Sequence, residues 1–451
     1  MEIKIKSNKE FINNKEGKLI SICFGLFGIA SLLAWNAIIA QIPFFTHYLD
    51  SLNPSVSFPL LNKLFNIPLQ FILLIKKKLF SLKFQLIFSI IVSIICLISL
   101  PFSVFSFEKN DKISIIVTVL LVLTMGLINA LIQSGFLALT SYFPLEKIVF
   151  YSTGQGISGV IMALLQLLVL FYINTGDPDN DFKYGALIFF GISIFILLIV
   201  LCSLIYIFNS DYGKAYLPSS AYRNKEVKKM NENIDNQNDN ISTDENQNIK
   251  IFNIERENLK SVSKNKEEIE NKKYWFFDLF KSLKDAIFFI WYNFFITFSV
   301  YPSNYIGQQL FNTGKYKTNI IILIFCFCNT LGRYIMKFSK PSKNLGYKII
   351  LGRTILVFLL ILNHYFNIIL GVNTNITSFC LIINLILLSG SNGFDSSLSF
   401  GLAPTLVTGE YKGKAGNAIS LFQVVGGVCG SSFAFITQKI IRIISSYKSD
   451  E

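Results

Sequence analysis

The chain has 451 residues, of which 52% are hydrophobic and only 15% are charged, and its mean hydropathy is +0.50. A water-soluble domain of this size cannot bury so much apolar surface in one core, so the composition indicates a membrane protein. The formal net charge of +13 would suit a nucleic-acid partner. The lysines, however, lie in short loops beside apolar segments and in one long polar insert, which favours a role in membrane orientation.

About eleven apolar windows are long enough to cross a bilayer. A spanning helix needs about 20 mostly apolar residues, because a helix of that length satisfies its own backbone hydrogen bonds across the hydrocarbon. We therefore predict membrane-spanning helices over residues 18–41, 55–75, 84–106, 113–139, 147–173, 184–208, 282–301, 318–338, 348–370, 377–402 and 415–437.

A polar segment separates the sixth window from the seventh. It is rich in Asn, Lys, Glu, Asp and Ser and has few aromatic residues, which predicts a disordered loop. The predicted organisation is an N-terminal segment 1–17, a six-helix half 18–208, the loop 209–274, a five-helix half 275–437 and a tail 438–451.

Lysine and arginine in the short loops predict the orientation through the positive-inside rule. Residues 42–54 and 371–376 contain neither, whereas residues 76–78 are three consecutive lysines. We therefore expect the N-terminus and the 209–274 loop to be cytoplasmic.

The first and fourth windows carry an indole and two amides at membrane depth. Trp35 lies midway along the first window, deeper than an interfacial tryptophan, where it could stack on a planar ring. Asn129 and Gln133 are four residues apart and share a helix face, and their amides suit a nucleobase edge because each offers a donor and an acceptor. Packing of the indole in the core and hydrogen bonding between helices are the structural alternatives.

Small residues cluster in the fifth window around Gln155, namely Gly154, Gly156 and Gly159, and Gly332 lies in the eighth window. Small residues let helices approach closely. We expect these five positions to serve helix packing or gating rather than ligand contact.

Arg333 in the eighth window is an intramembrane cation, and Asn329 lies one turn away on the same face. A guanidinium presents donors that fit two vicinal hydroxyls or a carboxylate. The alternative is that Arg333 extends toward the inner surface, as Lys337 and Lys340 follow closely.

Asp395 in the tenth window is the second unusual charge, and Asn392 lies on the same polar stripe. A carboxylate at this depth needs a partner, which Arg333 or a captured proton would supply. A structural polar contact between helices is the alternative.

Motifs of catalysis and cofactor binding are missing from the sequence. It has no phosphate-binding Gly-rich Lys motif and no HExxH, and its two histidines are too few for a histidine metal site. The seven cysteines lie in or beside apolar runs without the spacing of a disulfide framework or zinc site. We therefore expect no enzyme activity, no cofactor and no metal.

Short motifs in the first half resemble those of the equilibrative nucleoside transporter family. Residues 31–36, Ser-Leu-Leu-Ala-Trp-Asn, resemble the family's Leu-Leu-Pro-Trp-Asn, with Ala34 in place of the proline. Residues 133–135, Gln-Ser-Gly, are similar to its Gln-Gly pattern. Residues 152–159, Ser-Thr-Gly-Gln-Gly-Ile-Ser-Gly, are similar to its Ser-Gly-Gln-Gly-Leu-Ala-Gly pattern.

The second half continues the resemblance in the same order. Residues 297–302 match Thr-x-x-x-x-Pro, and residues 391–394, Ser-Asn-Gly-Phe, resemble the family's Ser-Asn-Gly-Tyr. Residues 329–333 occupy the place of Asp-x-x-Gly-Arg, with Asn329 replacing the aspartate, and residues 415–417 resemble the start of the family's eleventh helix. The resemblance spans nearly the whole chain.

The resemblance implies an all-α polytopic fold with eleven transmembrane helices in a 6+5, major-facilitator-like arrangement. It implies that Trp35 flanks the base and that Gln133 and Asn129 bind its edge. Arg333 and Asn329 would hold the ribose hydroxyls, and Asn392 and Asp395 would line the second half of the site.

The expected function is facilitative transport of nucleosides or nucleobases, including purine uptake, by alternating access, with a proton influence if Asp395 titrates. The alternatives are a sugar or drug carrier of the major facilitator type, which would have twelve spans, and a receptor or channel that does not transport. The expected partners are a small-molecule substrate and the lipid bilayer, with no nucleic acid. The plasma membrane is favoured over an internal membrane.

Overall fold

A computed structural model describes residues 14–52, 54–75, 81–106, 111–172, 177–217, 277–301, 305, 317–368, 374–409 and 411–449. Contacts divide the chain into two compact units, Met1–Ser210 with Leu283–Glu451, and Asp211–Ser282. The described part of the second unit contains the short helix α9 (Asp211–Tyr216) and the first residues of the span Phe277–Val300. The first residues of the predicted 209–274 loop are therefore helical, and the rest of that loop lies outside the described residues.

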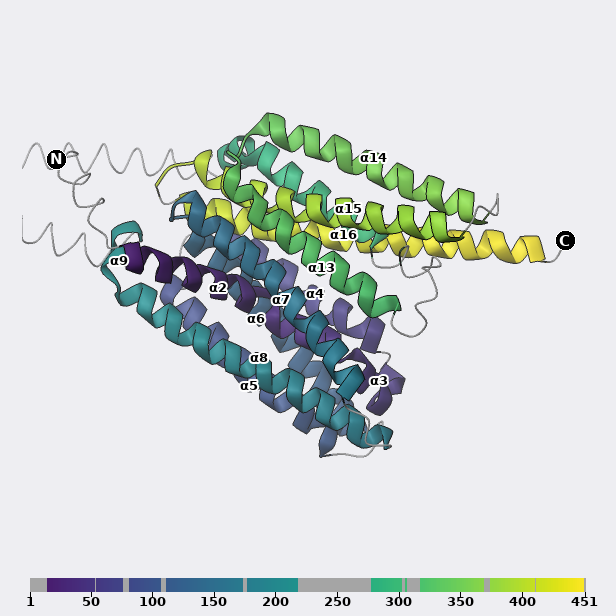
Figure 1. Ribbon diagram of the computed structural model, residues 1–451. Helices are drawn as coiled ribbons and strands as arrows, with labels where there is room; N and C mark the ends of the chain where they lie inside the picture. The colour runs from purple at the N-terminus through teal and green to yellow at the C-terminus, as the bar shows by residue number, and fades with distance from the viewer. Residues whose placement is uncertain are drawn as a thin grey trace, which may run out of the picture. The chain divides into compact units, whose positions relative to one another are not determined.

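The regular secondary structure in the described residues of the larger unit is all helical (Figure 1). Its labelled α-helices are α2 (Asn14–Ala40), α3 (Ile42–Tyr48), α4 (Pro54–Ile75), α5 (Leu82–Phe105), α6 (Lys112–Thr140), α7 (Leu145–Tyr172), α8 (Pro178–Asn209), α13 (Lys317–Ile335), α14 (Lys343–Ile368), α15 (Thr374–Leu402) and α16 (Tyr411–Ser449). Short 3₁₀ turns η1 (Asp50–Leu52), η3 (Met336–Phe338) and η4 (Ala403–Thr405) follow α3, α13 and α15.

Eleven of the described helices are long and apolar enough to cross a membrane, which confirms the predicted number and the all-helical class. Each span begins within five residues of its predicted start; the span predicted from residue 348, for example, begins at Lys343. Polar side chains cap several helix starts, as Asp111 does by accepting from the backbone N–H groups of Ile113 and Ser114. The hydropathy pattern therefore predicted the starts of these spans to within about one and a half turns.

Apolar side chains cover the surface of the bundle, and polar side chains are buried in its interior beside apolar ones. Large apolar side chains such as Phe195, Leu351 and Phe358 are exposed on the helix surfaces, whereas many serines, asparagines and glutamines are buried between helices. Lipid solvates the apolar exterior, and the buried polar groups hydrogen-bond one helix to the next. This distribution is typical of a membrane-spanning bundle.

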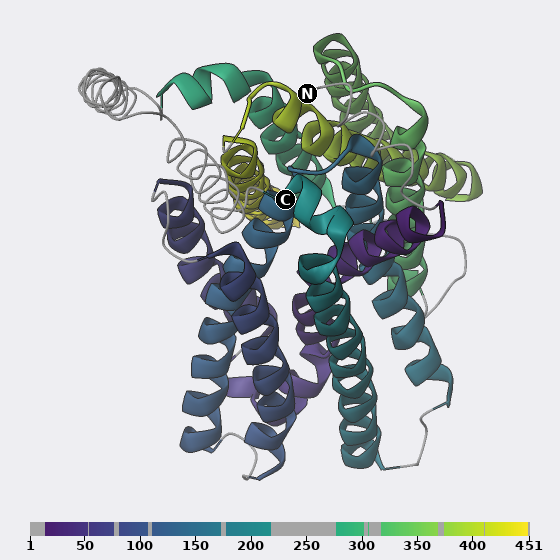
Figure 2. The same ribbon diagram turned by 90° about the vertical axis from the view of Figure 1, so that its left-hand side faces the viewer.

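Close helix contacts join α7 to α2 and to α13. A Cβ atom added at Gly154 would overlap the Gly25 carbonyl of α2, and one added at Gly156 would lie 2.6 Å from Thr330 Oγ1 of α13. On another side of the bundle, α5 packs against both α6 and α8, and Figure 2 shows these helices running alongside one another. Helix α7 therefore contacts helices from both the N-terminal and the C-terminal parts of the chain.

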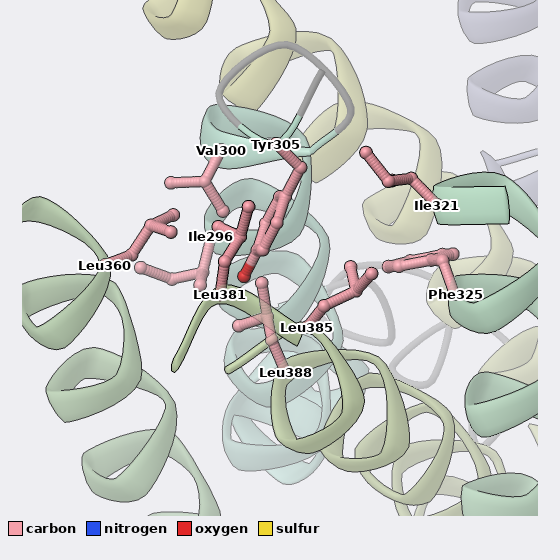
Figure 3. Close-up of a cluster of buried hydrophobic side chains, with 9 residues drawn as sticks. All are labelled: Ile296, Val300, Tyr305, Ile321, Phe325, Leu360, Leu381, Leu385 and Leu388. Atoms are coloured by element: carbon pink, nitrogen blue, oxygen red, sulfur yellow. The ribbon is translucent and has the colours of Figure 1, made fainter. Parts of the chain in front are cut away.

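An apolar cluster holds the C-terminal helices together (Figure 3). Leu385 and Leu388 of α15 pack with Phe325 of α13 and Ile296 of the span Phe277–Val300. The Tyr305 side chain is fully buried in this cluster and donates its hydroxyl hydrogen to Asn384 Oδ1, 2.5 Å away. The cluster supports one side of the polar network described below.

Candidate substrate-binding and gating site

Arg333, in the last turn of α13, is buried against α7. Only 3% of the residue is exposed, and Nη1 lies 2.9 Å from both Ser152 Oγ and Gln155 Oε1. The guanidinium therefore points between helices and does not extend to the surface. Its second terminal nitrogen, Nη2, has no hydrogen-bond partner among the described residues, which leaves donors free for a ligand.

Gln155 connects this arginine to the first helix. Its amide oxygen accepts from Arg333, and its amide nitrogen lies 3.2 Å from Ser31 Oγ and 3.1 Å from the Tyr151 hydroxyl. Ser397 of α15 adds a second link because it donates to Ser152 Oγ at 2.7 Å. A hydrogen-bond network therefore joins α13 and α15 to α7 and α2.

Further contacts join the two parts of the chain at the same end of the bundle, where α7 and α16 begin and α13 and α15 end. We call it the predicted inner end. Lys414 of α16 donates to the Leu74 carbonyl of α4 at 2.6 Å, and the Lys337 ammonium lies 5.3 Å from the Phe150 ring centre. Gly416 packs against the Leu137 carbonyl of α6. These contacts keep the helices together at the predicted inner end.

A second polar network lies wholly within the C-terminal helices. Asn392 donates to Asn329 Oδ1 at 3.0 Å, and its own amide oxygen lies 2.9 Å from the Thr297 hydroxyl. The Asn293 amide donates to Ser396 Oγ at 3.0 Å. The structure therefore brings the predicted residues Asn329 and Asn392 into direct contact.

Arg353 of α14 is a functional candidate that sequence analysis missed. It is fully buried, and it donates to the Leu388 carbonyl and Ser391 Oγ, each at 2.9 Å, and to Thr297 Oγ1 at 2.5 Å. An arginine inside an apolar window was the available signal. The predicted window began at residue 348, which placed Arg353 near a helix end, whereas α14 begins at Lys343.

Asp395 is fully buried in α15 and does not pair with Arg333. Neither carboxylate oxygen has a hydrogen-bond partner among the described residues, and the basic group that acts on it electrostatically is Arg353. The ion pair considered between Asp395 and Arg333 is therefore wrong, because Arg333 turns toward α7 while Asp395 lies on the side of Arg353.

The amide pair of the fourth span has its own partner. Gln133 is 6% exposed and accepts from the Gln70 amide of α4 at 3.4 Å, and Gln70 also donates to Asn66 Oδ1 at 2.8 Å. Asn129 is 7% exposed, and its side chain forms no hydrogen bond with the described residues. The structure thus extends the predicted pair onto a neighbouring helix.

Trp35 is half-buried on α2. Neither a hydrogen bond nor a ring contact engages its indole in the described parts of the chain. Its neighbour Asn36 donates to Ser158 Oγ of α7 at 3.0 Å. Trp35 and the amides Asn129 and Gln133 therefore make no direct contact with Arg333.

The predicted small residues all lie at helix crossings. Gly159 packs against Cys326 Sγ, and a Cβ atom at Gly332 would overlap the Gly390 carbonyl of α15. With Gly154 and Gly156, these positions bring α7, α13 and α15 close enough for the Arg333 network to form. Within the described ranges, no three His, Cys, Asp or Glu side chains gather as a metal site.

The fold is similar to that of solved major facilitator transporters. A solved major facilitator proton:xylose symporter, XylE, aligns with a TM-score of 0.63 over 95% of this chain and 90% of its own, at 11% identity. A variant of the E. coli fucose:proton symporter FucP aligns with a TM-score of 0.56 over 94% and 92% of the two chains, at 12% identity. At such low identity, the similarity concerns the fold alone.

Sequence comparison then defines the family. The profile of the nucleoside transporter family matches residues 118–439, which is more than half of the chain. This chain belongs to the nucleoside transporter family and is a multi-pass membrane protein. It is also 24% identical over 200 residues to a protein of Arabidopsis thaliana named equilibrative nucleotide transporter 4, a match covering 44% of this chain and 47% of the relative. The aligned region thus spans just under half of the relative's length.

Proposed function

We propose that this protein is a facilitative transporter of nucleosides or nucleobases that works by alternating access. Membership of the nucleoside transporter family supports the substrate class. The link from Arg333 to Ser152 and Gln155 carries the mechanism, because it joins helices from the two parts of the chain through hydrogen bonds that can break and re-form. Breaking this link opens the predicted inner end, and re-forming it closes that end.

Substrate recognition is divided among residues on both parts of the chain. Trp35 stacks on or flanks the base, and Asn129 and Gln133 bind the base edge. The free Nη2 donors of Arg333 bind a ribose hydroxyl. Arg333 thus contacts the substrate through Nη2 and the gate residues Ser152 and Gln155 through Nη1. Substrate binding is therefore coupled to opening and closing of the gate.

The second polar network positions the remaining ligand groups. Asn329 accepts from Asn392 through its oxygen, so its amide nitrogen stays a donor for the ribose. The Asn392–Asn329 bond fixes the rotamers of both side chains. Asp395 lines the site behind them.

Uptake into proteoliposomes tests the role of Arg333. We expect Arg333→Ala to reduce uptake of adenosine and inosine at least tenfold, because it removes both the gate link and the ribose donors. Hypoxanthine has no ribose, so we expect its uptake to fall through loss of the gate link alone. Arg333→Lys keeps the charge but loses the two-sided donor geometry, so we expect partial activity. Lys112→Met, which removes an exposed cation at the start of α6, is the matched control.

Two results would contradict the proposal. Normal nucleoside uptake by Arg333→Ala would remove this residue from the mechanism. Saturable uptake of xylose or fucose by the wild-type protein, without nucleoside uptake, would favour the sugar-carrier alternative.

Transport is also proton-influenced through Asp395. A buried carboxylate without hydrogen-bond donors is costly as an anion, and a proton removes that cost. We expect an inwardly directed proton gradient, with the acidic side outside, to change the initial uptake rate of the wild type. It should not change the rate of Asp395→Asn, whose amide mimics the protonated acid. A gradient effect of equal size in both proteins would contradict this role.

In this proposal, the protein lies in the plasma membrane, and its N-terminus and the 209–274 loop lie in the cytoplasm. The distribution of lysine and arginine among the short loops supports this orientation. Epitope tags at the N-terminus and within the loop should be accessible to antibody only after permeabilisation of cells. Labelling of intact cells would reverse the orientation.

A further inference from the structure

Lys63 lies inside a membrane-spanning helix. It is the seventh of the 19 residues of the span Ser57–Ile75 in α4, about 9 Å along the helix axis from Ser57 and about 18 Å from Ile75. Lysines near helix ends reach the interface with their flexible stems. The four-carbon stem of Lys63 is too short to reach either membrane surface.

The side chain projects into the protein rather than into lipid. Lys63, Asn66 and Gln70 share a helix face by their spacing of three and seven residues, and both amides are buried, at 1% and 0% exposure. Ile72 lies on the opposite face, nine residues on, and is exposed. Protein atoms desolvate the ammonium group, although part of the side chain remains accessible.

The face of Lys63 continues to the predicted base-binding amides. Gly126 of α6 packs against the Asn62 carbonyl, and Gln133 accepts from Gln70. These two contacts show that α4 and α6 lie side by side. Along the helix axis, Lys63 is therefore about two turns from Gln70 and its partner Gln133. Asn129 lies between the levels of Lys63 and Gln133.

No group in the part of the chain that the structure describes neutralises Lys63. It forms neither a hydrogen bond nor an ion pair in the described parts of the chain, and the fully buried acid, Asp395, interacts with Arg353. An uncompensated cation inside the membrane costs several kcal/mol, so such a residue marks a functional site. An electron-rich ligand would compensate it.

We propose that Lys63 binds an electron-rich oxygen of the substrate and makes the transporter selective for substrates that present one in this position. The inference deepens the proposed function and rests on it. An ammonium group has three donors and no acceptor. The 6-oxopurines, hypoxanthine and guanine, offer the O6 and N7 acceptors to it, whereas adenine places an amino donor at position 6.

A phosphate oxygen offers the same chemistry with a full negative charge. Lys63 would then bind a nucleoside monophosphate, and the base would lie elsewhere in the site. The two sources are separated by comparing nucleosides with different bases and a monophosphate as substrates.

Purified protein in liposomes is assayed for uptake of inosine, guanosine, adenosine and inosine monophosphate. The variants are Lys63→Met, which keeps the length of the stem but removes the charge, and Lys63→Arg, which keeps the charge. Lys112→Met is the control, because it removes a lysine at the end of a span and not inside one. The melting temperature of each variant in detergent shows whether it is folded.

If the base oxygen is the ligand, wild type prefers inosine and guanosine over adenosine in kcat/KM by about tenfold, the size expected for one correct base contact. Lys63→Met abolishes this preference by losing 6-oxopurine uptake while keeping adenosine uptake, and Lys63→Arg restores part of it. If phosphate is the ligand, wild type transports inosine monophosphate and Lys63→Met loses that activity alone.

Equal loss of all substrates in a folded Lys63→Met protein would overturn the assignment, as would unchanged uptake of all of them. Both results leave nucleoside transport by the wild type intact. Absence of uptake of every compound by the wild type overturns the assignment together with the proposed function.

Discussion

At the scale of single residues, two buried arginines have different surroundings. Arg333 bonds to a helix in the other part of the chain, whereas Arg353 bonds only within the C-terminal helices. Arg353 is also the cation that interacts electrostatically with Asp395. In the proposed mechanism, the contacts of Arg333 therefore change during transport, whereas those of Arg353 persist.

Arg353→Ala should destabilise the protein by about 3–5 kcal/mol, because it leaves a buried carboxylate without a cation and several acceptors without donors. Thermal unfolding in detergent measures the loss. The double variant Arg353→Met with Asp395→Asn removes both charges and should recover part of the stability. A double variant less stable than Arg353→Ala would show that the two residues are not electrostatically coupled.

From the sequence, two of the buried charged residues could be predicted. Their partners in the folded protein could not. Arg333 and Asp395 stood out inside apolar windows, yet Arg333 pairs with residues of α7 about 180 positions away. Asp395 is coupled to Arg353 instead. Helical spacing predicts which residues share a face of one helix, as it does for Asn129 and Gln133, but the neighbour of that face depends on tertiary packing.

At the scale of helices, the small residues of α7 determine how closely α13 approaches. Apolar windows predicted the spans because the length requirement is local. The pairing of α7 with α2 and α13 is a long-range property, and only the glycine pattern gave a local sign of it. Gly25 and Gly28 of α2 belong to the same packing, and they were not singled out because no polar motif accompanies them.

Gly156→Ala should weaken the α7–α13 contact, because the new methyl group would lie 2.6 Å from Thr330 Oγ1 and 2.9 Å from its Cα atom. We expect a loss of about 1–3 kcal/mol in stability and reduced uptake. Gly191→Ala on α8 is the control, since nothing lies within 4 Å of its added Cβ atom. Equal melting temperatures for the two variants would contradict close packing at Gly156.

At the scale of the whole molecule, the contacts described at the predicted inner end join the two parts of the chain, and in the proposed mechanism they hold that end closed. Major facilitator folds alternate by relative movement of two helix groups around a central site. Ser152 and Ser397 come from opposite groups and their hydroxyls are 2.7 Å apart. The number and order of spans were predictable, whereas the closed state follows only from such long-range contacts.

A disulfide between these positions should lock the carrier. In the double variant Ser152→Cys with Ser397→Cys, we expect oxidant to reduce nucleoside uptake to near background and reductant to restore it, because side chains this close satisfy disulfide geometry. Each single variant, which retains the seven native cysteines, is the control. Undiminished uptake by the cross-linked protein would show that this contact persists throughout the cycle.

In the proposed transport cycle, the hydrogen bonds that Gln155 forms on both sides have a consequence for how the empty carrier resets. When Arg333 departs, the Gln155 amide nitrogen still has Ser31 and Tyr151 as partners, so the side chain keeps its orientation. Ordering a free glutamine side chain would cost up to about 2 kcal/mol of rotamer entropy. Because that ordering survives in the open state, the returning guanidinium meets an acceptor already in position, and closure needs no conformational search on the α7 side.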